Sequence, residues 1–149
     1  IKDNHLEDKI KVINDDIKNL DKYFEINYID IILCNPPYFL LDNEFTTSDK
    51  EYLKMARHEG DMTISDVARL SKIYLRDGGS LFLVSRADRL FEIRDTLIEN
   101  KLAIKEIQFI YHDLDNTSKL VLIEARKSGK EHGLKVLKPI ILEEGDVNG

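Results

Sequence analysis

The sequence has little cysteine, proline or glycine, no tryptophan and no long apolar run. Its 149 residues include one cysteine, three prolines and seven glycines. The single cysteine excludes an internal disulfide framework, and with no signal peptide before the first expected strand we expect a cytoplasmic protein. No apolar run approaches the roughly 20 residues that a membrane-spanning helix needs, so we expect no membrane association. The length predicts a single domain over residues 1–149.

Two common site signatures are also missing. None of the glycines forms a G-x-G pattern of the kind that cradles phosphates. The histidines, at positions 5, 58, 112 and 132, have no spacing to one another or to Cys34 that indicates a metal site, so we expect no metal. Cys34 lies within an apolar run, and we interpret it as a small buried hydrophobic residue rather than a nucleophile.

The charge balance argues against a protein that coats nucleic acid by charge alone, because the net charge is −6. Residues 50–105 differ from the rest, with 11 basic and 9 acidic side chains. This small local excess fits either a solvated helix surface or a patch that contacts phosphates. The sequence leaves both interpretations open.

The most informative stretch is Asn35-Pro36-Pro37-Tyr38, which follows the short apolar and β-branched run Ile29–Cys34. The run predicts a strand that is buried on both faces. In an open α/β sheet, ligands bind in the crevice at the carboxyl ends of the strands. We therefore expect Asn35 to face a substrate.

The residue types in this stretch favour recognition of a planar amino group. Two consecutive prolines make the loop stiff and poor in N–H donors. The Asn35 side-chain oxygen and the Pro36 carbonyl can accept both hydrogens of an adenine amino group, and Tyr38 can stack on a base that has left its helix. The same tetrapeptide also makes an ordinary turn after a strand. The strand before it and the aromatic ring after it favour methyl transfer to an amino nitrogen.

The rest of the chain predicts alternating strands and helices. Thr63 and Asp66 have capping-box spacing and begin a helix that continues to about Arg76, where Asp77-Gly78-Gly79 ends it. Two strands without an intervening helix close the chain, and we expect them to be antiparallel. The expected strands are Lys9–Asn14, Ile29–Cys34, Ser80–Ser85, Ala103–Tyr111, Lys119–Arg126 and the edge strand Ile140–Leu142, with helices at Ile17–Phe24 and Leu90–Glu99 and a long loop from Phe39 to Gly60.

Further candidate site residues flank these elements, and each has a structural alternative. Asp16, after the first expected strand, fits an acceptor for an adenine ring as well as an N-cap for the helix that follows. Arg57 and His58 fit a phosphate-positioning cluster or a charged helix end. Arg86 and Arg89 follow a central strand, where they can contact substrate or pair with neighbouring carboxylates.

The whole pattern resembles the later part of a class I S-adenosylmethionine-dependent methyltransferase, which is an α/β fold with a Rossmann-like, mostly parallel sheet and a C-terminal antiparallel hairpin. Asn-Pro-Pro-Tyr is typical of enzymes that methylate planar amino or amide nitrogens. The finer resemblance is to the bacterial tRNA1(Val) (adenine-N6)-methyltransferases. It rests on Ala56-Arg57-His58-Glu59, Arg86-Ala87-Asp88-Arg89-Leu90 and Leu137-Lys138-Pro139-Ile140-Ile141.

The resemblance implies S-adenosylmethionine as cofactor and tRNA as partner, with an anticodon-loop adenine of a valine tRNA as the methylated base. It assigns Asn35, Pro36 and Tyr38 to catalysis, with Asn35 also near the donor. Pro37, the three arginines at 57, 86 and 89, and His58 would bind substrate. Asp16 would contact the donor adenine.

Members of this family carry roughly another third of chain in front, with a glycine-rich donor loop and a ribose-binding acid. Neither is present in this sequence. We therefore expect residues 1–149 alone to bind little donor and to be inactive. Two alternatives stay open: a release-factor glutamine methyltransferase, which uses the same tetrapeptide, and a non-catalytic methyltransferase-like subunit that binds RNA.

Overall fold

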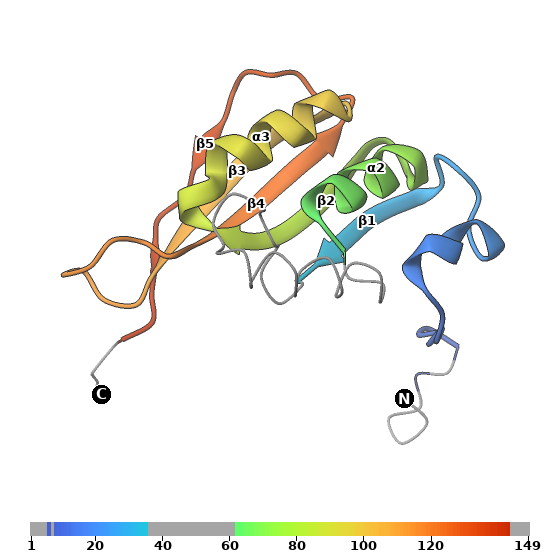
Figure 1. The fold of residues 1–149 in the computed structure, drawn as a ribbon, viewed down its shortest axis with the longest axis horizontal. Coiled ribbons are helices and arrows are strands. Elements are labelled where there is room, and N and C mark those ends of the chain that lie inside the picture. The colour runs from blue at the N-terminus through green and yellow to red at the C-terminus, as the bar shows by residue number, and fades with distance from the viewer. Residues whose placement is uncertain (1–5, 7, 36–61, 144–149) are drawn as a thin grey trace, which may run out of the picture.

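The computed structural model describes residue 6 and residues 8–35 and 62–143 (Figure 1). Within these residues, no helix is long and apolar enough to cross a membrane. The regular elements, in chain order, are the 3-10 helix η2 (Ile17–Lys22), β1 (Ile29–Cys34), α2 (Ile64–Tyr74), β2 (Leu75–Arg86), the 3-10 turn η4 (Ala87–Arg89), α3 (Leu90–Glu99), β3 (Leu102–Tyr111), β4 (Leu120–Lys127), β5 (Lys135–Val136) and β6 (Ile140–Ile141).

The strands form one mixed sheet in the order β1-β2-β4-β3-β5, with β6 also paired to β3. β1 and β2 are parallel, and β5 and β6 are each parallel to β3. β4 is antiparallel to both β2 and β3, so it alone runs against the other described strands. The expected α/β sheet, mostly parallel with a C-terminal antiparallel hairpin, is confirmed, as is pairing of the chain's last apolar run at the sheet edge.

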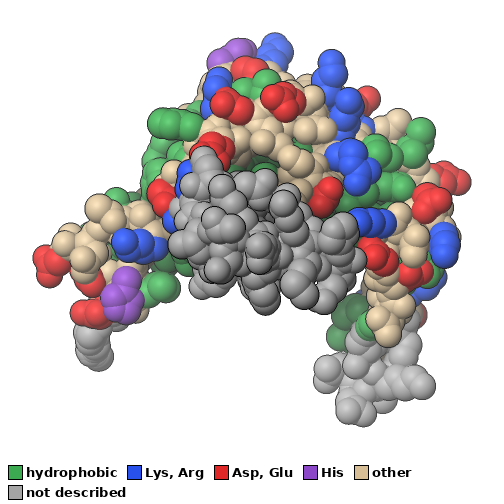
Figure 2. Space-filling model, in the orientation of Figure 1, with side chains coloured by type: hydrophobic (Ala, Val, Ile, Leu, Met, Phe, Trp, Pro, Cys, Tyr) green, Lys and Arg blue, Asp and Glu red, His purple; other side chains and the backbone are tan. Residues whose placement is uncertain are grey.

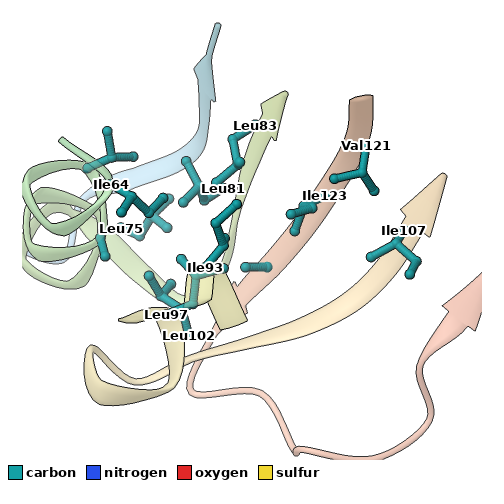
Figure 3. Close-up of a cluster of buried hydrophobic side chains, with 13 residues drawn as sticks. Ile64, Leu75, Leu81, Leu83, Ile93, Leu97, Leu102, Ile107, Val121 and Ile123 are labelled. Carbon is teal, nitrogen blue, oxygen red and sulfur yellow. The ribbon is translucent and has the colours of Figure 1, made fainter. Parts of the chain in front are cut away.

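The helices α2 and α3 pack on the same face of the sheet, where they bury the hydrophobic core (Figure 3). Leu81 and Leu83 of β2 lie opposite Ala125 and Ile123 of β4, and these side chains all point toward the helices. The helices contribute apolar residues spaced at helical periods, because only one side of each faces the sheet. These residues are Ile64, Val67, Ala68, Ile93 and Leu97.

The start of α2 follows the sequence prediction. Thr63 is the N-cap, and its Oγ1 accepts a hydrogen bond from the Asp66 backbone N–H at 3.2 Å. The Asp66 carboxylate in turn accepts from the Thr63 backbone N–H at 3.1 Å. This reciprocal pair satisfies two donors that the first turn of a helix otherwise leaves unpaired.

The end of α2 differs from the prediction. The helix stops at Tyr74, and the strand β2 begins at once, so Gly78 and Gly79 lie within a strand and do not end the helix. The β1–β2 register jumps there, since Ile29 pairs with Leu75 but Ile31 pairs with Ser80. Gly78 has φ +83°, and a Cβ on Gly79 would lie 2.9 Å from the Arg76 carbonyl oxygen. The two glycines therefore permit a bulge against β1.

The expected strand Lys9–Asn14 is wrong, because the structure has no regular element there. Ile10 and Val12 are 44% and 75% exposed. A strand needs a neighbour for its backbone hydrogen bonds, and none of the described strands pairs with this segment. The expected helix Ile17–Phe24 is shorter than predicted and is a 3-10 helix with non-helical backbone angles at Asn19.

The two-sided burial predicted for β1 is also wrong. Ile32 and Cys34 pack against the core, while Ile31 and Leu33, on the other face, are 57% and 79% exposed. In β2, Leu81 and Leu83 are buried and the alternate residue Phe82 is exposed. The reason is that both long helices of the described structure cover the same face of the sheet.

A buried lysine joins three elements at the amino end of β1. Lys127, the last residue of β4, donates from Nζ to the Leu75 carbonyl at 2.7 Å and to the side-chain oxygen of Asn27. Leu75 is the C-cap of α2, so the ammonium group lies at the negative end of that helix. Asn27 has φ +56° and its backbone N–H donates to the Ile73 carbonyl. Lys127 thus ties β4 to the α2–β2 junction and to the approach to β1.

We predict that Lys127→Met lowers the free energy of unfolding by about 2 kcal/mol or more, because a buried acceptor left without a partner costs about 1–3 kcal/mol. Urea unfolding at pH 7, followed by circular dichroism, measures this loss. Lys135→Met, at an exposed position in β5, is the matched control and should change stability by about 0.5 kcal/mol or less. Equal losses in the two variants would contradict the structural role of Lys127.

Candidate functional site

The candidate site lies where β1 and β2 end side by side. The two strands are parallel, and Cys34 pairs with Leu83. Asn35, the next residue, is therefore level with the last part of β2, which ends at Arg86. The carboxyl ends of parallel strands form the ligand crevice of an open α/β sheet. The structure thus brings Asn35 and Arg86 to the same edge, as the sequence predicted.

Asn35 is exposed and lines a pocket of about 420 Å³. The pocket lies on the sheet face opposite α2 and α3, and its walls come from four strands and from the segment between β5 and β6. Most of the lining is apolar, and the polar contributions come from side chains of β3 and β4 and from Asn35. The lining includes Leu33, Phe82, Val84, Leu122 and Leu137, together with Glu106, Gln108 and Glu124. Such a lining suits a flat, largely apolar group with a few polar atoms.

The remaining residues of the predicted substrate loop lie outside the described residues. These are Pro36, Pro37 and Tyr38, together with Arg57 and His58. Their roles stay predictions from the sequence.

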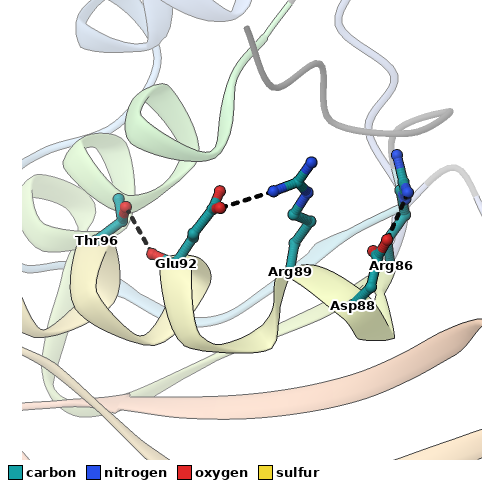
Figure 4. Close-up of polar contacts among 5 residues, drawn as sticks. All are labelled: Arg86, Asp88, Arg89, Glu92 and Thr96. Atoms are coloured by element: carbon teal, nitrogen blue, oxygen red, sulfur yellow. Dashed lines mark hydrogen bonds and ion pairs between the residues drawn. The ribbon is translucent and has the colours of Figure 1, made fainter. Parts of the chain in front are cut away.

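Arg86 and Arg89 both pair with carboxylates of their own segment (Figure 4). Arg86 donates to Asp88 at 2.6 Å, and Arg89 donates to Glu92 at 2.8 Å across one turn of α3. The Arg89 side chain is largely covered, at 17% exposure, and the Arg86 side chain is 34% exposed. Pairing with neighbouring carboxylates, the alternative role considered for Arg86 and Arg89 in the sequence analysis, is therefore present.

Of the two roles that the sequence left open for Asp16, the structure shows the helix cap. Asp16 is the N-cap of η2, and its carboxylate accepts from the Lys18 backbone N–H at 2.9 Å. The chain then reaches β1 past the C-terminal end of α2, where Tyr28 donates to the Tyr74 carbonyl. Figure 1 shows η2, in blue, beside the end of the sheet from which the β1 arrow points away. The structure does not bring Asp16 to Asn35.

Asp15 forms a small hydrogen-bonded cluster that the sequence prediction missed. Its carboxylate accepts from the Tyr23 hydroxyl at 2.6 Å and from the Asn19 amide at 2.8 Å. The Tyr23 hydrogen bond is the main reason that the pKa of Asp15 falls to about 2, and the same bond raises the pKa of Tyr23. The spacing of Asp15, Asn19 and Tyr23 by four residues was the available signal.

Cys34 agrees with its interpretation as a small hydrophobic residue. It packs against the core, and burial raises the pKa of its thiol. A thiol with a raised pKa is a poor nucleophile at neutral pH.

A histidine and two carboxylates meet at the end of β3, which sequence spacing did not indicate. His112 Nε2 lies 3.0 Å from Glu143 Oε1, and one ligand atom each of His112, Asp113 and Glu143 falls within 4.8 Å of the others. Asp113 also accepts from the Asp115 backbone N–H at 2.9 Å. Pairing of β6 with β3 brings Glu143 here, because its backbone N–H donates to the His112 carbonyl. The His112–Glu143 contact and the turn at Asp113 account for the cluster.

No protein-family model matches the sequence, and no curated protein matches it either. The fold is similar to solved structures of larger proteins. One is a predicted O-methyltransferase from Agrobacterium tumefaciens, with a TM-score of 0.59 and 20% identity over 89% of this chain and 52% of that one. Another is a protein from Thermus thermophilus described as a DNA modification methylase, with a TM-score of 0.51 and 14% identity over 78% of this chain and 53% of that one.

The Thermus protein has also been solved in complex with S-adenosyl-L-methionine, and that structure gives a TM-score of 0.50 at 15% identity. The chain spans about half the length of the proteins that it matches. At these identities the similarity shows the fold. A Rossmann-like α/β fold is therefore established for the described residues.

We predict that Tyr23→Phe raises the pKa of Asp15 from about 2 toward its ordinary value of 3.8. The folded-state pKa lies below the unfolded one, so these hydrogen bonds stabilise the fold above about pH 4, and the stabilisation is lost as the pH falls toward 2. A carboxyl-carbon NMR titration of Asp15 measures the shift. Tyr28→Phe, at an exposed tyrosine, is the control. A pKa still near 2 in Tyr23→Phe would contradict the assignment.

Proposed function

We propose that this chain is the substrate-binding part of an S-adenosylmethionine-dependent methyltransferase that methylates N6 of an adenine in tRNA. The observation that carries the proposal is the position of Asn35. It directly follows a parallel strand at the carboxyl edge of the sheet, it is exposed, and it lines an apolar pocket. In the sequence, Pro-Pro-Tyr comes next. The similarity to methyltransferase structures supports the reaction class.

The chemistry required of the chain is positioning. The cofactor supplies an activated methyl group. Asn35 Oδ1 and the Pro36 carbonyl accept the two amino hydrogens, which favours a pyramidal nitrogen with its lone pair free for attack. Held in this way, the amino nitrogen would take the methyl group that the cofactor supplies when bound, the sulfur would leave with the bonding electrons, and the proton would leave the nitrogen afterwards. The rate gain comes from orientation and from fixed hydrogen-bond acceptors.

The described residues supply only part of a cofactor site. Asp16, the residue expected to contact the donor adenine, caps η2 and is not brought to Asn35. The sequence also lacks a G-x-G loop. We therefore place the remaining cofactor contacts outside the described residues, and we derive no step from their geometry.

The choice of tRNA over other substrates rests on the sequence motifs and on modest charge. The net charge is −6, and acidic and basic side chains are interspersed over the face shown in Figure 2. Such a surface suits recognition of one exposed base by a shaped loop more than binding along a duplex by charge. A release-factor glutamine is the second candidate substrate, because the same acceptors can orient an amide nitrogen.

The deciding assay supplies radiolabelled S-adenosylmethionine to the gene product that carries this chain, with bulk tRNA, duplex DNA and release factors as separate substrates. Label in tRNA that digests to N6-methyladenosine is the expected result. Label in release factors alone would establish the second candidate. Label in none of the three would favour a non-catalytic, RNA-binding subunit and contradict the proposal.

We predict that Asn35→Ala lowers the single-turnover methylation rate by about 10²–10³, the usual loss for one preorganised polar contact, while tRNA binding changes little. The loss falls on the rate because the hydrogen bond matters most as the amino group becomes pyramidal. Asn100→Ala is the matched control, since it removes an amide at the opposite edge of the sheet. A rate within threefold of wild type for Asn35→Ala would remove the role assigned to it.

We predict that replacing Arg57, Arg86 or Arg89 by Ala weakens tRNA binding and makes its salt dependence shallower by up to about one unit of log–log slope, as for one lost phosphate contact. Filter binding between 50 and 200 mM salt measures the slope. Arg94→Ala is the control, because Arg94 is an exposed residue of α3 paired with Asp95. Slopes unchanged in all three variants would contradict a phosphate-binding role for these arginines.

A further inference from the structure

The corner where η4 leads into α3 carries an aromatic side chain that the core does not use. Leu90, Ile93 and Leu97 form the side of α3 that packs on the sheet. Phe91 is 79% exposed, more than any other aromatic residue that the structure describes. Successive residues of a helix are turned by about 100°, so Phe91 points away from the side on which Leu90 packs. Its ring is therefore accessible to a ligand.

A lysine lies beside the same corner, on the neighbouring chain segment. The Ala87 backbone N–H donates to the Lys119 carbonyl at 2.9 Å, which places Lys119 next to the first residue of η4. Lys119 is exposed and directly precedes β4. Phe91 is four residues beyond Ala87, and residues four apart along a helix lie roughly 6 Å from each other. Phe91 and Lys119 are therefore both neighbours of Ala87.

The carboxylates of this corner already have cationic partners. Asp88 pairs with Arg86 at 2.6 Å, and Glu92 pairs with Arg89 at 2.8 Å (Figure 4). Among residues 8–35 and 62–143, by contrast, no carboxylate lies within ion-pair distance of Lys119. An anionic group of a ligand can therefore meet the Lys119 ammonium without displacing either ion pair.

We propose that this corner binds the nucleotides that flank the target adenine, with Phe91 stacked on an unpaired base and Lys119 in contact with a phosphate. An aromatic ring next to a cation matches the alternation of bases and phosphates along a single strand. Phe91 and Lys119 lie on the side of the sheet that α2 and α3 already cover, because Ala87 and Leu90 pack against the core there.

The corner stands at the same edge of the sheet as Asn35. Cys34 pairs with Leu83, so η4, which begins at Ala87, lies about 10 Å beyond the level of Asn35 along the strand direction. A base held at Asn35 stays joined to its neighbours in the RNA chain, and these neighbours must pass close to this edge. The inference rests on the proposed function for the base at Asn35, and it adds where the adjoining nucleotides lie.

The need for both side chains separates a single strand from other anionic ligands. A duplex keeps its bases stacked on one another, so it would contact Lys119 and leave Phe91 without a partner. A free phosphate group would likewise use Lys119 alone. Loss of affinity on replacing either residue is therefore the result that marks an unpaired strand.

The test measures binding of a fluorescein-labelled, 12-nucleotide single-stranded RNA of mixed sequence to the gene product that carries this chain, by anisotropy and without cofactor. Phe91→Ala should weaken binding about tenfold, as for one lost base stack, and Phe91→Trp should restore it to within about twofold. Lys119→Ala should weaken binding and make the log–log salt slope shallower by about 0.7, the value for one phosphate contact of a single strand.

Two variants outside the corner are the matched controls. Tyr28→Ala removes a tyrosine that is 65% exposed at the amino end of β1, and Lys135→Ala removes an exposed lysine of β5. Both should bind the RNA within about twofold of wild type, because neither side chain lies at the carboxyl edge near η4. Circular dichroism verifies that every variant is folded.

Wild-type affinity in both Phe91→Ala and Lys119→Ala, or no binding of the RNA to the wild-type protein, overturns the proposal. A loss in only one of the two variants also overturns it, because the paired contact is then absent. The labelling assay for methylation is separate from these results. Weaker RNA binding in both variants without methylated tRNA would keep the corner and reject the methylation, and methylated tRNA with unchanged variants would do the reverse.

Discussion

The strand β2 is the element on which the other described elements depend. It pairs with β1 in parallel and with β4 in antiparallel orientation, so it links the candidate site to the C-terminal hairpin. Its inward residues Leu81 and Leu83 lie in the core beneath the helices. The bulge at Gly78 and Gly79 sets the register with β1. Because that register places Asn35 level with the end of β2, the geometry of the site follows from the β1–β2 pair.

The two edges of the sheet have different chemistry. At the amino edge, Lys127 fills the acceptors of Leu75 and Asn27, so polar groups there are satisfied internally. At the carboxyl edge, Asn35 is exposed and lines a pocket. Polar groups that are hydrogen-bonded within the protein are typical of a structural junction, whereas an exposed acceptor such as the Asn35 side chain can bind a ligand. This difference supports the carboxyl edge as the functional one.

The candidate site continues onto the sheet face that α2 and α3 leave uncovered. Asn35 lines the same pocket as Leu33, Phe82 and Leu122, whose side chains lie on the sheet face opposite α2 and α3.

Sequence reasoning did well where the decisive interactions are local. The capping box of Thr63 and Asp66, the helix Leu90–Glu99, and the β3–β4 hairpin each depend on residues close in the chain, and all three are confirmed. The strand predicted at Lys9–Asn14 is wrong, because its apolar pattern is that of a strand but none of the described strands lies beside it to form the backbone hydrogen bonds. The glycine pair was taken as a helix stop, since a bulge depends on the register with β1.

What the sequence by itself determined is the order and type of the main elements and the place of Asn35 after an apolar strand, because periodicity and turn chemistry act within a few residues. Only the tertiary structure decided that Asp16 lies away from Asn35, that Lys127 joins three elements, and that Glu106 and Glu124 stand side by side. These facts depend on strand register and on which face the helices cover. Both are set by contacts between residues far apart in the chain. A one-residue slip in the register of a strand would turn all its side chains to the opposite face of the sheet.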